Sequence, residues 1–175
     1  MGVKNEMRDF AIALAEGLDR IGVAFRKDQG ELPMSVHMVR FPASGVPEVA
    51  MVDLSSGKYG STKPEIAKRV RKMATQWGAR YVLMQNEAWM SFGQESEHNA
   101  AAEWMRAGHS LETFPDRKEM MMVHADGPDL DLIIHREIAP DGSIGDPARI
   151  ENGVTTGTLT NLSGRGVAAF PDQVN

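Results

Sequence analysis

ARYVLMQNEAWMSF, residues 79–92, has the side-chain alternation and the apolar content of a central β-strand, and the rest of the chain can be arranged around it. Successive side chains of a strand point to opposite faces of its sheet. One set is expected to cover a core, with Asn86 as the only polar interruption: Val82, Met84, Ala88, Met90 and Phe92. The other set forms an aromatic and polar face, where we expect any function to lie: Tyr81, Leu83, Gln85, Glu87, Trp89 and Ser91.

The length and composition are those of one globular domain. The chain has 175 residues, of which 42% are hydrophobic and 25% charged, so it can bury a sizeable core. Its formal net charge of −5 provides no general attraction to nucleic acid or to an anionic membrane. Without cysteine it can form neither a disulfide nor a thiolate metal site. We expect a cytoplasmic protein, since no apolar run approaches the roughly 20 residues of a membrane span.

Two longer helices and one short helix are predicted. In residues 5–21 apolar side chains recur at three- and four-residue spacing, which predicts an amphipathic helix that ends at Gly22. The segment TKPE at residues 62–65 has the pattern of a capping box with proline in the first turn, so a second helix is expected to begin there and to end at Gly78. A cluster of alanines predicts a third, short helix over about residues 97–106.

Four further segments alternate as strands and pair in two hairpins. Residues 34–41 and 48–54 flank a turn with two prolines and a glycine, and residues 119–125 and 130–138 flank the turn sequence DGPD. Antiparallel hairpins with helices between them indicate an α+β fold, in which a mainly antiparallel sheet packs against the two longer helices. The order of elements is similar to that of the profilin-like regulatory and roadblock domains, a likeness of fold that implies no function.

The C-terminal part of the chain differs in composition. From Ala139 onward Gly, Thr, Ser and Asn dominate, and residues 154–162 are the only plausible strand. We therefore predict one domain over residues 1–138 and an extended C-terminal arm over residues 139–175, which either adds an edge strand or is partly disordered.

Two short segments resemble a pattern in small uncharacterised proteins of bacteria and their phages. They are Asn86-Glu87-Ala88-Trp89 and Pro115-Asp116-Arg117-Lys118-Glu119, and the likeness covers roughly residues 62–138. The resemblance implies a bacterial or phage origin and supports the strand prediction. It assigns no catalytic residue, because no activity is established for those proteins.

A set of histidine and aspartate residues on the second hairpin is a candidate metal site. In the predicted hairpin His124 and His135 share a face, near Asp131, and such a set on adjacent strands can bind a divalent metal. Two histidines facing solvent explain the same pattern, because the spacing matches no known metal signature. Asp126, Asp129 and Asp131 resemble a calcium loop in composition only, and turn chemistry accounts for aspartates around a Gly-Pro turn.

Glu87 is the candidate catalytic residue, because a carboxylate in an otherwise apolar strand must be paired, exposed or functional. Pairing with Arg117, Arg136 or Lys118 would make it structural. Alternatively, Glu87 acts as a general base in a pocket on the aromatic face of its strand.

The second helix carries a basic run on its outward side: Lys63, Lys68, Arg69, Arg71 and Lys72. Such a run can meet nucleic acid or an acidic partner. No aromatic residues interleave with these charges and the rest of the protein is acidic, so a solvated helix face is the better explanation and nucleic-acid binding is disfavoured. No GxSxG elbow, phosphate loop, dinucleotide fingerprint or HExxH motif is present.

The sequence thus favours a non-enzymatic protein that binds a protein partner or assembles with itself. Methionine and aromatic side chains suit adaptable interfaces, and the residues predicted to bind are Tyr81, Trp89, Met120 and Met122. A homo-oligomer formed through a sheet edge or an exchanged arm is the specific prediction. The alternative is a metal-assisted hydrolase that uses His124, Asp131, His135 and Glu87. The sequence identifies no cofactor.

Overall fold

The computed structural model describes residues 3–90 and 95–151. The helices are α1 (Val3–Gln29), α2 (Lys63–Trp77) and α3 (Glu95–Arg106), and a 3₁₀ helix, η1, spans Leu111–Thr113. The strands are β1 (Ser35–Arg40), β2 (Glu48–Asp53), β3 (Tyr81–Met90), β4 (Lys118–Gly127), β5 (Leu130–Ile138) and β6 (Ala148–Glu151).

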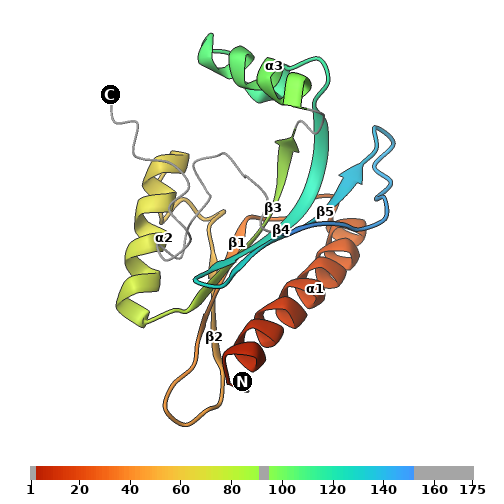
Figure 1. The fold of residues 1–175 in the computed structure, drawn as a ribbon. Coiled ribbons are helices and arrows are strands. Elements are labelled where there is room, and N and C mark those ends of the chain that lie inside the picture. The colour runs from red at the N-terminus through yellow and green to blue at the C-terminus, as the bar shows by residue number, and fades with distance from the viewer. Residues whose placement is uncertain (1–2, 91–94, 152–175) are drawn as a thin grey trace.

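These strands form one antiparallel sheet in the order β2-β1-β3-β4-β5-β6. The predicted central strand, β3, pairs with β1 on one side and with β4 on the other. Helices α1 and α2 lie on opposite faces of the sheet (Figure 1). The predicted α+β fold, with a mainly antiparallel sheet and two longer helices, is therefore confirmed.

Helix α1 is longer than its sequence predicts. Gly22 does not end α1, which continues to Gln29, and Gly30 follows in the left-handed conformation with a φ of 85°. Gly22 lies where the helix meets the sheet, and a Cβ atom there would be 2.4 Å from Nε2 of Gln85. That amide donates a hydrogen bond of 2.7 Å to the carbonyl oxygen of Leu18. Glycine at this position therefore permits close packing and does not end the helix.

Both faces of β3 are buried over residues 81–86, which corrects the prediction of one core face and one functional face for this part of the strand. Towards α1, Tyr81 and Leu83 join a core of alanine and leucine side chains from the helix. Towards α2, Val82 and Met84 join a second core with the buried side chains of that helix. Because helices cover both sides of the sheet, this part of the central strand has no face left for solvent.

The predicted start and end of α2 are confirmed. The hydroxyl of Thr62 accepts a hydrogen bond from the backbone N–H of Glu65, and the Glu65 carboxylate accepts one from the backbone N–H of Thr62. Hydrogen bonds from the backbone N–H groups of Ser61 and Thr62 hold the pKa of the Glu65 carboxyl below its usual value. Gly78 follows the helix in the left-handed conformation, with a φ of 75°.

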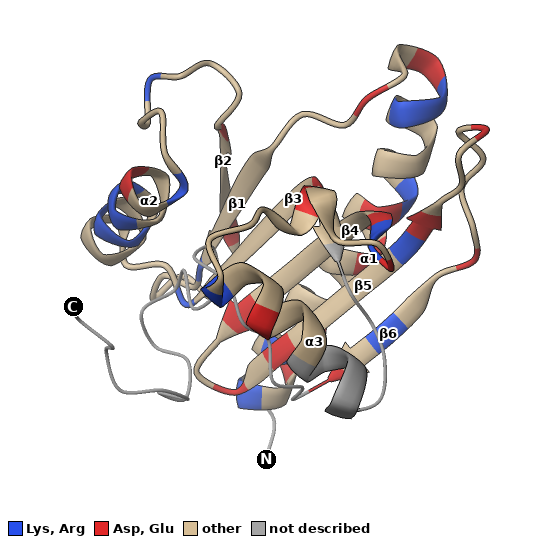
Figure 2. Cartoon of the chain, turned by 90° about the horizontal axis from the view of Figure 1, so that it is seen from above, with Lys and Arg blue, Asp and Glu red and all other residues tan. Residues whose placement is uncertain are grey.

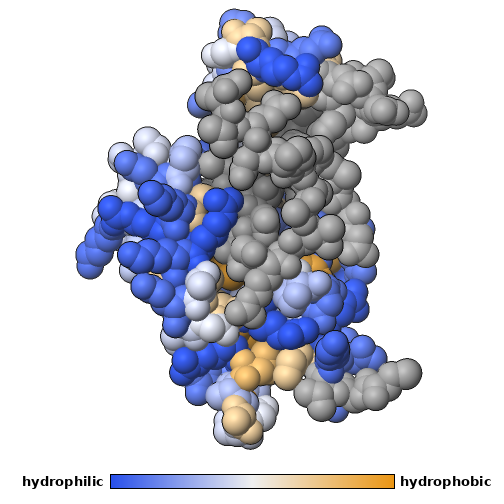
Figure 3. All heavy atoms as spheres, turned by 60° about the vertical axis from the view of Figure 1, so that its left-hand side comes forward, coloured by the Kyte–Doolittle hydropathy of each residue, from blue (hydrophilic) through white to orange (hydrophobic). Residues whose placement is uncertain are grey.

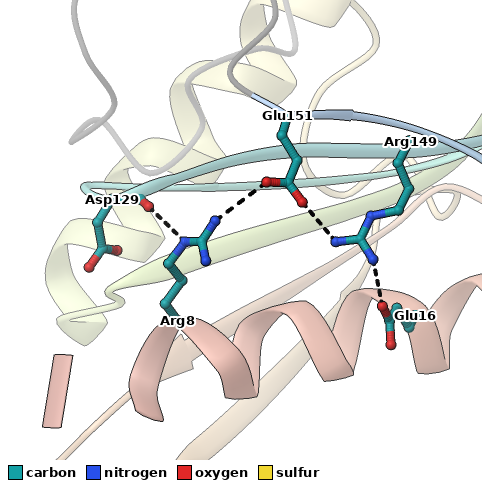
Figure 4. Close-up of polar contacts among 5 residues, drawn as sticks. All are labelled: Arg8, Glu16, Asp129, Arg149 and Glu151. Atoms are coloured by element: carbon teal, nitrogen blue, oxygen red, sulfur yellow. Dashed lines mark hydrogen bonds and ion pairs between the residues drawn. The ribbon is translucent and has the colours of Figure 1, made fainter. Parts of the chain in front are cut away.

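Ion pairs tie one side of α1 to the far end of the sheet. Arg149 of β6 donates to Glu16 of α1 at 2.7 Å and to Glu151 at 2.9 Å (Figure 4). Arg8 of α1 lies 3.5 Å from Glu151 and donates to the backbone carbonyl of Asp129 at 3.3 Å. Exposed pairs of this kind each add little stability, but together they hold α1 against β6.

The sheet continues past Ile138, after which the sequence places the C-terminal arm. A backbone bridge pairs Ile138 with Ile144, and β6 then pairs with β5. This strand has four residues and adds an edge to the described sheet, which is one of the two alternatives predicted for the arm, but it lies before residues 154–162, where a strand was expected. The strand predicted over residues 154–162 lies outside the described residues.

Candidate interaction surface

Glu87, the predicted catalytic residue, is held by structural contacts. Its Oε1 accepts from Nε of Arg26 at 2.7 Å and from the backbone N–H of Leu32 at 2.8 Å. The side chains of Glu87 and Arg26 are only 19% and 12% exposed. A carboxylate engaged by two donors is a structural acceptor, which argues against its predicted role as a general base.

An ion pair of Glu87 was one of the alternatives predicted. Its partner is Arg26, at the end of α1, and not one of the three cations named from the sequence. Those cations have other partners: the Trp89 ring for Arg117, Asp19 for Arg136 and Glu137 for Lys118. The partner was missed because the predicted helix ended at Gly22, before Arg26.

The predicted metal ligands are brought together only in part. Nε2 of His124 lies 2.8 Å from Oδ1 of Asp131, and the register places both on the same sheet face as His135, as predicted. His124 is opposite Ile133, so Asp131 and His135 lie on either side of it along β5. Their positions on the strand are roughly 13 Å apart, too far for one metal ion with ligand distances of about 2 Å. Accordingly, the described residues contain no group of three or more His, Asp or Glu side chains placed to hold a metal ion.

Asp129, in the turn between β4 and β5, is also a structural acceptor. The Tyr81 hydroxyl donates to it at 2.6 Å, and Nη2 of Arg80 donates at 2.9 Å. Burial disfavours the charged form, but the hydrogen bonds from Tyr81 and Arg80 outweigh it and hold the pKa of Asp129 below its usual value. A Cβ on Gly127 would be 2.2 Å from the Tyr81 ring, so this glycine lets the ring lie against the turn.

Of the four residues predicted to bind a partner, only Trp89 reaches the surface. Tyr81 is fully buried, and Met120 and Met122 are 3% and 8% exposed. Their burial leaves no surface for a partner, which corrects the prediction for these three; the methionines fill the protein interior instead. Trp89 is 37% exposed, and the guanidinium of Arg117 lies 4.9 Å from its ring.

Sequence reasoning missed an apolar area that we call the hairpin surface. It consists of Val46, Val49 and Met51 from the β1–β2 hairpin, which are 64%, 44% and 68% exposed. Three of the seven large apolar side chains that are exposed among the described residues lie on this hairpin, and two more, Ile21 and Phe25 with 64% and 43% exposed, lie on α1. Figure 3 shows hydrophobic atoms at the lower end of the molecule, which carries this hairpin in Figure 1.

The register of the sheet explains why the β2 side chains are exposed. Val49 pairs with Val39 and Met51 pairs with His37, so these side chains lie on the α1 side of the sheet. Helix α1 packs against β3, β4 and β5, and β2 is two strands away from β3. Val49 and Met51 therefore extend past the part of the sheet that the helix covers.

The side of α1 that packs against Phe41 is apolar as well. The ring of Phe10 packs edge-on against Phe41, which directly follows β1, with ring centroids 5.9 Å apart. Leu14, Ile21 and Phe25 follow on the same side of the helix at helical spacing. Ile21 and Phe25 are the two that remain exposed.

Strand β2 is also an edge of the described sheet, because it pairs with β1 alone. A charged side chain lies at each of its ends: Glu48 accepts from Arg40 at 2.7 Å, and Asp53 accepts from the backbone N–H of Ser55 at 2.8 Å. The residues between them, 49–52, carry no charge. Edge strands normally carry charge or proline that prevents further pairing, so the middle of β2 is open to strand addition.

The basic run of α2 lies on its solvent side, and Figure 2 shows Lys and Arg along this helix. Arg69 donates to the backbone carbonyl of Lys58 at 2.7 Å, so part of the run anchors the loop before the helix. These positions agree with a solvated helix face.

Comparisons with known proteins give no relative to argue from. No protein-family model, no curated protein and no solved structure matches this chain. The likeness to the profilin-like and roadblock domains therefore stays a prediction. Within the described residues, no helix combines the length and the apolar character needed to cross a membrane.

Proposed function

We propose that this protein acts without catalysis, as a cytoplasmic binding protein of bacterial or phage origin that assembles with a second copy of itself. One observation carries the proposal: β2 lies at the edge of the described sheet and exposes Val49 and Met51 by 44% and 68%. Such an edge offers unpaired backbone groups together with apolar side chains, which is what strand addition requires.

A second copy of β2 complements this edge. In an antiparallel pair centred on a two-fold axis at Ala50, Val49 faces the partner's Met51, and Met51 faces the partner's Val49. Glu48 then faces the partner's Val52, and Asp53 faces the partner's Pro47. No carboxylate lies directly opposite another, so the pairing joins apolar residues without a charge penalty.

The same pairing extends the apolar area. Successive side chains alternate between faces, so residues 49 and 51 of both copies project on the α1 side of the joined sheets. They form one apolar stripe across the two-fold axis.

The alternative, a metal-assisted hydrolase, has less support from the geometry. Glu87 is engaged by Arg26 and Leu32, and His135 lies too far from Asp131 to share a metal ion with it. No observation on the described residues favours catalysis over assembly.

Charges placed at two positions of β2 test the pairing and its register together. Val49→Lys with Met51→Lys sets lysine opposite lysine at two sites, so the dimer is expected to dissociate. Val49→Glu with Met51→Lys sets opposite charges across the same two sites, so the dimer is expected to persist. Both variants remove the same apolar side chains, which leaves the charge pattern as the only difference. Sedimentation equilibrium at micromolar concentration gives the mass of each.

Met105→Lys is the control for adding a lysine elsewhere. Met105 lies on α3 and is 45% exposed, so its replacement should leave the dimer unchanged. A monomeric wild-type protein at these concentrations would refute the proposal, and so would identical masses for the two double variants.

A further inference from the structure

A charged cleft lies between α1 and the β5–β6 edge, away from the hairpin surface. Its volume is about 320 Å³. Helix α1 lines it with Glu16, Asp19 and Arg20, and the two strands line it with Ile134, Arg136 and Arg149. This volume lies at the lower end of the range of small-molecule sites, about 300–1,000 Å³.

The two carboxylates of the cleft are already neutralised by arginines. Arg136 holds Asp19 with a forked contact, Nε to Oδ1 at 2.9 Å and Nη2 to Oδ2 at 2.7 Å. Arg149 holds Glu16 at 2.7 Å (Figure 4). These pairs fix both arginines at the walls of the cleft. Each carboxylate is paired with an arginine, so it repels an incoming anion less than a free carboxylate would.

Arg20 is the third arginine that lines the cleft, and it takes no part in these ion pairs. It is exposed, and no hydrogen bond or ion pair joins it to any described residue. A guanidinium has five N–H donors, so Arg20 offers its complete fork to the cleft. Arg149 uses only its two terminal nitrogens in the contacts above, and its Nε–H makes none with the described residues.

We infer that this cleft binds a small organic oxyanion, a carboxylate or a phosphate, through Arg20 with help from Arg149. Among the residues that line the cleft, Arg136 and Arg149 are paired with carboxylates, and Arg20 is the cation without such a partner among the described residues. The planar fork of arginine matches both carboxylate and phosphate oxygens. Ile134 and Pro147 supply apolar wall, so the ligand carries a short apolar part beside its charge.

Titration with inorganic phosphate and with propanoate, followed by two-dimensional NMR of the full chain, tests this site and separates its two possible ligand classes. We expect saturable shifts of the backbone signals of Ile134 and Arg149 and of the Nε–H signal of Arg20. Propanoate alone producing them would identify a carboxylate ligand, and phosphate alone would identify a phosphate ligand. Binding of both would assign the site to the shared oxyanion chemistry.

Arg20→Gln is expected to raise the dissociation constant about tenfold or more, because the charge-assisted hydrogen bonds of the guanidinium are lost. The fold should survive, since Arg20 is exposed and bonded to no described residue. Arg106→Gln, an exposed arginine at the end of α3, is the matched control and should bind as the wild type does. Absence of saturable shifts with both anions would overturn the inference, as would equal affinities of Arg20→Gln and the wild type.

Discussion

Replacing Gly22 by alanine is expected to destabilise the fold, although alanine is the better helix former. The added Cβ would stand 2.4 Å from Nε2 of Gln85 and 3.4 Å from Sδ of Met121, inside the contact between α1 and the sheet. Gln85 is 6% exposed, and the same amide donates to the carbonyl oxygen of Leu18. The side chain cannot move aside without losing that hydrogen bond.

The expected free-energy change follows from these contacts. Overpacking a core costs about 1–3 kcal/mol, and leaving a buried amide unpaired costs about 1–3 kcal/mol. Alanine in place of glycine within a helix offsets about 0.5–1 kcal/mol of this. These two costs are alternatives, since Gln85 either stays and is overpacked or moves and loses its hydrogen bond, so the net loss in the free energy of unfolding should be about 1–2 kcal/mol.

Gly17→Ala is the matched control on the same helix. Among the described residues, no atom outside the neighbouring turns of the helix lies within 4 Å of a Cβ built at Gly17, so this variant should gain about 0.5–1 kcal/mol. Urea unfolding followed by circular dichroism measures both changes. The double variant Gly22→Ala with Gln85→Ala should lose less than the sum of the two single changes, because the clash is gone. A Gly22→Ala protein as stable as Gly17→Ala would show that the close contact is not real.

Two further predictions concern Glu87 and His37. Glu87→Ala should lower the free energy of unfolding by about 2 kcal/mol, because it leaves the Arg26 guanidinium and the Leu32 N–H without their acceptor; a loss near zero in urea unfolding would contradict the structural role. Burial lowers the pKa of His37 below its usual value of 6.5, so the unfolded chain takes up the proton first as pH falls. Stability from this group is therefore complete above about pH 6.5 and declines below it. Unfolding curves of His37→Asn should be flatter with pH than those of the wild type between about pH 7 and pH 5, and an unchanged slope would refute the assignment.

Local signals in the sequence were enough to predict most elements and their pairing. The capping box before α2 and the glycine after it depend on neighbouring residues alone, so both were correct. The second hairpin was predicted, but its turn is shorter than expected, because Asp126 and Gly127 extend β4 and Gly127 pairs with Leu130. The alternation of faces was correct, so His124, Asp131 and His135 share a face as predicted.

The errors came from contacts between distant segments. A glycine that follows an amphipathic helical pattern, such as Gly22, is typical of a helix end. Only the approach of Gln85, from β3, shows why glycine lies within this helix. The alternation of β3 predicts two different faces, but it cannot show that α1 and α2 cover both of them. For the hairpin surface a signal was present: residues 48–54 carry apolar side chains at both parities, although strand order, which decides exposure, was unknown.

Cross-linking through a single introduced cysteine tests the central claim, the pairing of β2 with a second β2, most directly. The chain has no cysteine, so Ala50→Cys supplies its only thiol. At the two-fold axis the two Cα atoms of residue 50 would lie about 4.5–5.5 Å apart, within disulfide range. In Val52→Cys, on the same face of β2, the two thiols would be roughly 13 Å apart along the paired strands.

After mild oxidation, denaturing mass spectrometry under non-reducing conditions counts the covalent dimer in each variant. Pairing of β2 about Ala50 predicts a covalent dimer for Ala50→Cys and little for Val52→Cys. No dimer for Ala50→Cys, or equal yields for the two variants, would contradict it.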